Sequence, residues 1–69
     1  MEKISITTPF IKLDQLLKYA NIAENGGMAK WMIMDGLIKV NGELVLQRGK
    51  KIVPGDVVEI LDYGKIIVE

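Results

Sequence analysis

The dipeptide Asn41-Gly42 constrains the fold of this chain more than any other feature of its sequence. It lies between two short apolar runs, residues 37–40 and 43–46. Asn-Gly in this setting is the strongest local signal of a β-hairpin, because both residues tolerate the positive φ angles of a tight two-residue turn. The sequence therefore predicts two antiparallel strands joined at this point.

Further strands are predicted in the rest of the second half. Pro54-Gly55-Asp56 has the composition of a tight turn and precedes a strand pattern over 57–61. Tyr63-Gly64 then precedes a last strand over 65–68. A polar, basic loop over 47–51 separates these strands from the hairpin. We expect the second half of the chain to form an antiparallel sheet.

The first half predicts one strand and two short helices. Residues 3–7 alternate apolar and polar, as a half-buried strand does. Residues 11–20 place apolar side chains at helical spacing, with Thr8 as the expected cap of this helix. A second helix is expected over 28–35, ended by Gly36. The order of elements predicts an α+β fold, with two short helices packed on a small antiparallel sheet that includes an N-terminal strand.

The composition excludes several classes of function. The chain has no Cys and no His, which excludes disulfides, thiolate zinc sites, and Ser/His/Asp or Cys/His catalysis. Asp14 and Asp56 form no convincing acid/base pair, so we expect no enzymatic activity, no metal and no cofactor. The apolar runs are too short to span a membrane, and Glu2-Lys3 follows Met1 in place of an apolar signal segment. We expect residues 1–69 to form one soluble, cytoplasmic domain.

The net charge of zero is unevenly distributed along the chain. Residues 1–29 balance, residues 30–55 carry +3 and residues 56–69 carry −3. A neutral total argues against a nucleic-acid-binding protein, which is commonly basic. The uneven distribution instead predicts a folded domain with one basic and one acidic face.

Three groups of residues have the chemistry to contact a nucleic acid. Exposed helix positions carry lysines with polar or aromatic neighbours, a flexible loop carries three cations, and two glycines offer backbone N–H groups at a helix start. The candidates are Lys12, Gln15, Lys18, Gly26, Gly27, Lys30, Trp31, Arg48, Lys50 and Lys51. Each group also has a simpler interpretation: solvated lysines, partial cover of the core by Trp31, a solubilising loop, and a turn.

Three stretches, taken in order, resemble the RNA-binding domain first described in ribosomal protein S-four, the alpha-L motif. They are Lys12-Leu13-Asp14 with Leu17, Ala29-Lys30 continuing through Ile33 and Gly36 to Val40-Asn41-Gly42, and Gly55-Asp56 with Val58. Segments 11–18, 26–30 and 48–52 are similar to small stand-alone bacterial members of the YaaA/YbcJ type. The resemblance implies two helices on a strongly bent antiparallel sheet, with RNA bound by the helix pair and an adjoining strand loop.

The resemblance also assigns roles by position. Lys12 and Lys30 stand where the family usually has arginines, and Trp31 stands where many members have a second cation. Asn25-Gly26 stands where many members have Ser-Arg, so a frequent phosphate-binding arginine is missing here. The amides of Gly26-Gly27 and the loop over 48–51 are the expected substitutes.

Two functional hypotheses follow from these patterns. The first is a stand-alone protein that recognises structured RNA, ribosomal or transfer RNA, by shape and phosphate contacts in ribosome assembly or translation. Its expected partners are that RNA, the ribosome and ribosomal proteins, and no membrane. The alternative is a docking or homodimerising module without direct RNA binding, in which Met28, Trp31 and Met34 form an apolar anchor.

Overall fold

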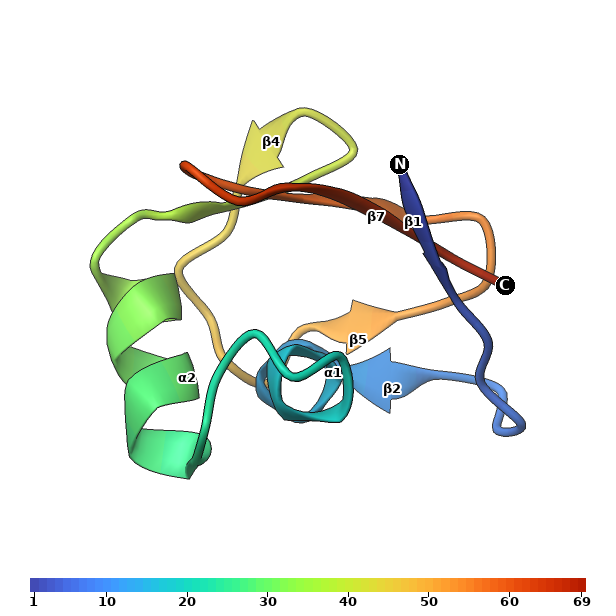
Figure 1. Cartoon of the computed structure of the whole chain (residues 1–69), viewed down its shortest axis with the longest axis horizontal. Coiled ribbons are helices and arrows are strands. Elements are labelled where there is room, and N and C mark those ends of the chain that lie inside the picture. The colour runs from blue at the N-terminus through green and yellow to red at the C-terminus, as the bar shows by residue number, and fades with distance from the viewer.

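The computed structural model describes residues 1–69, which form seven strands and two helices in two layers (Figure 1). In chain order the elements are β1 (Glu2–Ile4), β2 (Ile11–Lys12), α1 (Leu13–Tyr19), α2 (Gly26–Met34), β3 (Ile38–Val40), β4 (Glu43–Leu44), β5 (Lys51–Ile52), β6 (Val57–Ile60) and β7 (Gly64–Val68). One layer is a five-stranded sheet, and the other contains both helices and the small β2–β5 sheet. We call these the sheet layer and the helical layer.

The five strands of the sheet layer lie in the order β1-β7-β6-β3-β4. The predicted α+β class is confirmed, and the strands from β3 onward pair antiparallel as expected. The N-terminal strand β1 instead pairs parallel to β7, which makes the sheet mixed. Beyond β1, Ile6 N–H donates to the carbonyl of Glu69 at 3.0 Å, and Glu69 N–H donates to that of Ile4 at 2.8 Å. The first and last segments of the chain therefore lie side by side.

The hairpin at Asn41-Gly42 has the predicted turn. Asn41 has φ 52° and Gly42 has φ 84°, the two positive angles that a type I′ turn requires. Gly36 follows Asp35, the C-cap residue of α2, and has φ 83°. This left-handed conformation confirms the predicted helix end at Gly36. Both sites therefore have the backbone conformation that the sequence predicts.

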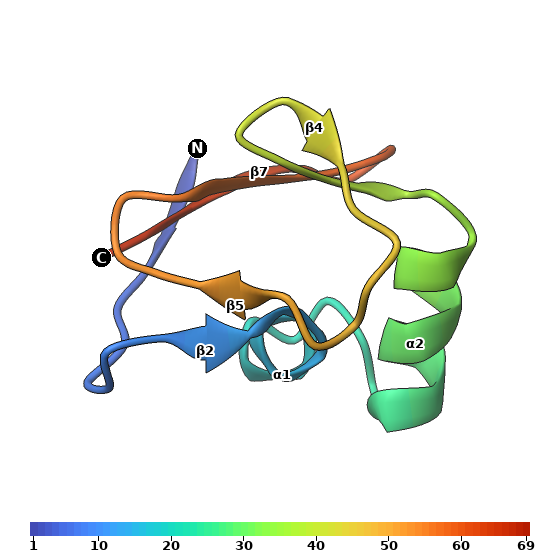
Figure 2. The same cartoon turned by 180° about the vertical axis from the view of Figure 1, so that it is seen from behind.

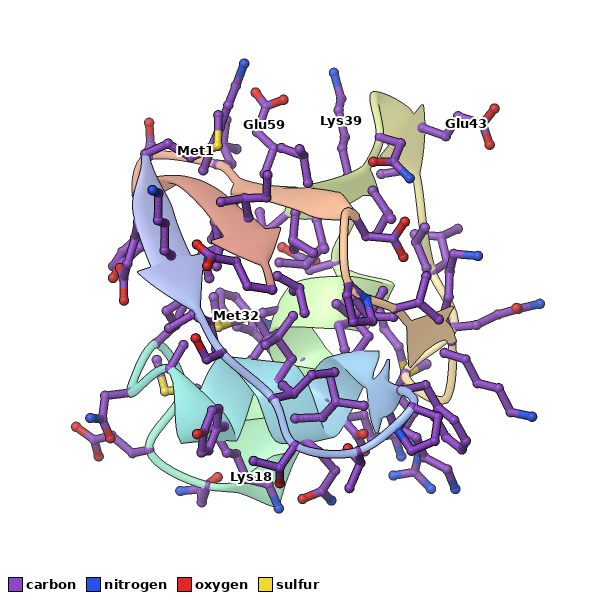
Figure 3. The ribbon with its side chains drawn as sticks, turned by 90° about the vertical axis from the view of Figure 1, so that its right-hand side faces the viewer. Met1, Lys18, Met32, Lys39, Glu43 and Glu59 are labelled. Carbon is purple, nitrogen blue, oxygen red and sulfur yellow. The ribbon has the colours of Figure 1, made fainter.

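The hydrophobic core lies between the two layers. It contains fifteen buried side chains and no buried polar one. Both helices contribute through one stripe each, and alternate residues of β3, β6 and β7 face them. The core residues are Leu13, Leu16, Leu17, Ala20, Ala23, Ala29, Met32, Ile33, Ile38, Val40, Ile52, Val58, Ile60, Ile66 and Val68. Figure 3 shows Met32 between the layers, whereas Lys39 and Glu59 lie on the sheet face that no helix covers.

The predicted start and cap of the first helix are wrong. Helix α1 begins at Leu13, because Ile11–Lys12 forms β2 and pairs with β5. The Thr8 hydroxyl donates to the carbonyl of Phe10 at 2.8 Å and does not cap a helix. The first N–H groups of α1 donate instead to backbone carbonyls of the loop before β5, from Leu13 to Lys50 at 2.9 Å and from Asp14 to Arg48 at 3.1 Å. Carbonyl groups of a loop that is distant in sequence thus accept the hydrogen bonds that a cap residue would otherwise accept.

The second helix begins two residues earlier than predicted, at Gly26. Asn25 is its N-cap residue, and the Asn25 Oδ1 accepts from the N–H of Met28 at 2.8 Å. The two glycines are therefore the first two residues of the helix and not a turn before it. Neither helix combines the length and the apolar character needed to cross a membrane.

Candidate nucleic-acid interface

Four candidate cations are brought together where α1 begins. Lys12 and Lys51 are directly opposite partners in the β2–β5 ladder. The hydrogen bonds from α1 to the loop carbonyls hold Arg48 and Lys50 against the same end of the helix. Figures 1 and 2 show this loop passing α1 on its way to β5. We call Lys12, Arg48, Lys50 and Lys51 the basic cluster.

The basic cluster carries a local electrostatic cost. Like charges directly opposite each other in a ladder are destabilising, and Lys12 faces Lys51 in this way. No lysine or arginine takes part in the side-chain hydrogen bonds of the fold. The cluster is therefore an exposed group of positive charges, and a bound anion would reduce their mutual repulsion.

Phe10 is a residue of this site that sequence reasoning missed. The ammonium of Lys51 lies 4.8 Å from the centroid of the Phe10 ring, a cation–π contact. This contact places the ammonium of Lys51 over the Phe10 ring, next to the β2–β5 ladder. The sequence does show an aromatic residue two positions before Lys12. However, Phe10 and its partner Lys51 are forty-one positions apart, so no local sequence pattern connects them.

A second group of candidates lies where α1 ends and α2 begins. A Cβ placed on Gly26 would lie 3.9 Å from the Nζ of Lys18, so this lysine reaches across to the first turn of α2. The N–H groups of Gly26 and Gly27 belong to the first turn, where a helix supplies no backbone partner. Asn25 already occupies the N–H of Met28. The predicted anion-binding amides, those of Gly26 and Gly27, therefore belong to the first turn of α2, beside the N–H that Asn25 occupies.

The remaining candidates lie on the outward surfaces of the helices. Gln15 is exposed on α1, and the neighbouring Tyr19 hydroxyl donates to the carbonyl of Ser5 at 3.2 Å. On α2, Lys30 and Trp31 point away from the core, and Trp31 is 58% exposed. This exposure does not support the interpretation of Trp31 as a cover for the core. Trp31 and Lys30 line a shallow hollow together with Gly27, Met34 and Asp35.

Charge is divided between the two layers. The helical layer holds six of the nine cations, all of them predicted site residues, and three acids, Asp14, Glu24 and Asp35. The sheet layer has the reverse balance, with three lysines and six acids. Figure 3 shows Lys18 at the helical end of the molecule and Glu43 and Glu59 at the opposite end. The fold therefore separates charge by layer, with +3 on one and −3 on the other.

The group with a clearly shifted pKa lies away from these candidates. The Tyr63 hydroxyl donates to the Glu2 Oε1 at 2.8 Å, and this hydrogen bond raises the pKa of Tyr63 above its ordinary value of 10.0. Desolvation and the negative charge of Glu2 act in the same direction. The bond joins the β6–β7 turn to the N-terminus and leaves Tyr63 neutral at physiological pH.

A comparison with known proteins identifies the family. The family described as S4 domain matches residues 4–69. This chain belongs to the S4-domain family. It is also 46% identical over 65 residues to the probable ribosome maturation protein RlbA of Bacillus subtilis (strain 168), a match that covers 94% of this chain and 92% of that protein.

The family confirms the resemblance found in the sequence. This S4 domain is an RNA-binding domain of a non-enzymatic family, which agrees with the predicted absence of catalysis. The match covers most of the relative, so the relative is itself a small protein of about this length.

Proposed function

We propose that residues 1–69 act as a single RNA-binding domain that recognises structured ribosomal RNA during maturation of the ribosome. The observation that carries the proposal is the placement of all six cations of the helical layer on the exposed or half-buried surface around α1 and α2. The similarity to a probable ribosome maturation protein supports ribosomal RNA over transfer RNA. A role on the ribosome also supports a cytoplasmic location.

The mechanism is recognition by shape and phosphate charge. The basic cluster binds phosphates on one side of α1, and Lys18 and Lys30 bind phosphates beside α2. Gln15 and Trp31 reach sugars or bases between them. Phosphate contacts fix the position of a protein on RNA, whereas bases are read where they are unpaired. The absent family arginine at Gly26 is offset by Lys18, which reaches the same turn.

The first experiment reverses two charges in the helical layer. Lys12 and Lys30 are both exposed and lie on different elements, so the double variant Lys12→Glu with Lys30→Glu should fold normally. It should reduce binding to deproteinised bacterial ribosomal RNA by at least about a hundredfold, because each site changes from attraction to repulsion of a phosphate. Filter binding measures the affinity, and circular dichroism checks the fold.

A matched double variant controls for net charge. Lys3→Glu with Lys65→Glu makes the same change in total charge on the sheet layer. It should bind ribosomal RNA within about threefold of the parent. If both double variants lose the same affinity, the interaction follows net charge only and the proposed face is wrong. If the parent itself does not bind ribosomal RNA, the proposed function is wrong.

A further inference from the structure

Helix α2 carries an apolar hollow on its outward surface, which shares Lys30 with the proposed phosphate contacts. The hollow measures about 330 Å³ and is lined by Gly27, Lys30, Trp31, Met34 and Asp35. These residues recur every three or four positions, so they form one stripe along the helix. Trp31 is 58% exposed and Met34 is 59% exposed, although large apolar side chains at such positions gain nothing from contact with water.

The walls of the hollow combine a flat apolar face with groups of both charges. Trp31 offers an indole ring and Met34 a polarisable thioether, both suited to contact with a planar π system. Lys30 supplies a cation and Asp35 a hydrogen-bond acceptor at the rim. Gly27 has no side chain, which leaves the end of the hollow near the helix start open. Its volume is at the small end of the roughly 300–1,000 Å³ typical of small-molecule sites.

These features suit one nucleotide better than a protein surface. Lys and Asp are depleted from the centres of protein interfaces, yet both flank Trp31 here. A nucleotide, in contrast, has a flat base for the indole, a phosphate for the ammonium, and a 2′-hydroxyl or amino group for the carboxylate.

We propose that this hollow receives one unpaired nucleotide of the bound RNA, with its base stacked on Trp31. The inference rests on the proposed function, because the phosphate contacts around α1 and α2 hold the RNA that supplies the nucleotide. It adds a specific requirement: the RNA has a bulge, loop or end from which a base can reach α2. Duplex RNA without such a base lacks the group that the hollow accepts.

The chain contains a single tryptophan, so its fluorescence reports on this hollow only. A base stacked on the indole quenches that fluorescence. Titration of the parent protein with deproteinised bacterial ribosomal RNA should quench it along the same curve that filter binding gives. Adenosine monophosphate tests the base without the RNA. It should produce no quenching at the RNA concentrations that saturate the protein, because the hollow is shallow and lacks the surrounding phosphate contacts.

Substitutions of Trp31 separate stacking from apolar contact. Trp31→Leu keeps an apolar side chain but removes the ring, and should weaken ribosomal RNA binding about fivefold to a hundredfold, the range found for loss of one stacked base. Trp31→Phe keeps a smaller ring and should recover most of that loss. Leu61→Ala is the control, since Leu61 is a similarly exposed apolar residue on the sheet layer. It should leave the affinity unchanged.

The outcomes distinguish this inference from the proposed function. If Trp31→Leu binds ribosomal RNA as the parent does and the parent shows no quenching, the stacking site is wrong while RNA binding stands. Quenching by adenosine monophosphate at the same concentrations as RNA would overturn it in favour of a free-nucleotide site. If Trp31 fluorescence changes with protein concentration in the absence of RNA, and sedimentation shows a dimer, the stripe is a contact between copies and the inference is wrong.

Discussion

The side chain of Asn41 joins two turns that lie fifteen positions apart in the chain. Its Nδ2 donates to the Asp56 Oδ1 at 3.0 Å, and its Oδ1 accepts from the N–H of Val57 at 2.9 Å. The other Asp56 oxygen accepts from the N–H of Val53 at 3.0 Å. Asn41 and Asp56, two of the motif residues that carried the family resemblance, therefore stabilise the sheet layer. Their role is structural and lies away from the candidate interface.

Removal of the Asp56 carboxylate tests this role. Asp56→Ala removes two hydrogen bonds to a charged acceptor, from the Asn41 amide and from the N–H of Val53, and the variant should lose about 1–3 kcal/mol of unfolding free energy. Urea denaturation measures the loss. Glu43→Ala removes an exposed carboxylate from the adjacent hairpin and should change stability by less than about 0.5 kcal/mol. Ribosomal RNA affinity below the unfolding transition should stay unchanged, and a drop would place this turn in the interface.

At the scale of elements, the start of α2 offers a gain of function. The resemblance found in the sequence places Gly26 where many family members have arginine, and a Cβ there would meet only the Nζ of Lys18, at 3.9 Å. Gly26→Arg should therefore fit, adding a phosphate contact and raising ribosomal RNA affinity several-fold. Gly26→Ala is the control, because it shares the improved helix propensity without the charge. Equal gains from both variants would show that helix stability, and not the cation, sets the affinity.

The same elements show where sequence reasoning works. Helix α2 and the Asn41-Gly42 hairpin depend on neighbours within a few positions, and both were predicted. The start of α1 depends on the pairing of Ile11–Lys12 with Lys51–Ile52, so the local signal from Thr8 was misleading. The parallel pairing of β1 with β7 is equally non-local. In the site, exposure on a helix was predictable from periodicity, whereas the contact of Lys51 with Phe10 was not.

For the whole molecule, the division of charge explains how a neutral chain can serve as an RNA-binding domain. The helical layer carries +3 and the sheet layer −3. Such a molecule is oriented by the field of a polyanion, so that its helical layer faces the RNA. The acidic layer repels phosphates and limits binding by any other surface. A neutral total thus reduces non-specific binding without removing the local attraction that binding requires.

This division predicts which cations set the salt dependence of binding. With about four to six phosphate contacts, each contributing roughly 0.7–0.9, log K should fall against log salt with a slope of roughly −3 to −5. Replacing Arg48 and Lys50 with Gln should reduce the magnitude of the slope by about two, since both lie in the basic cluster. Replacing Lys3 and Lys65 with Gln should not alter it, because both lie in the sheet layer. Filter binding across a series of KCl concentrations measures all three slopes. A parent affinity independent of salt concentration would contradict phosphate recognition. Equal slopes in all three proteins would show that the basic cluster does not contact the RNA.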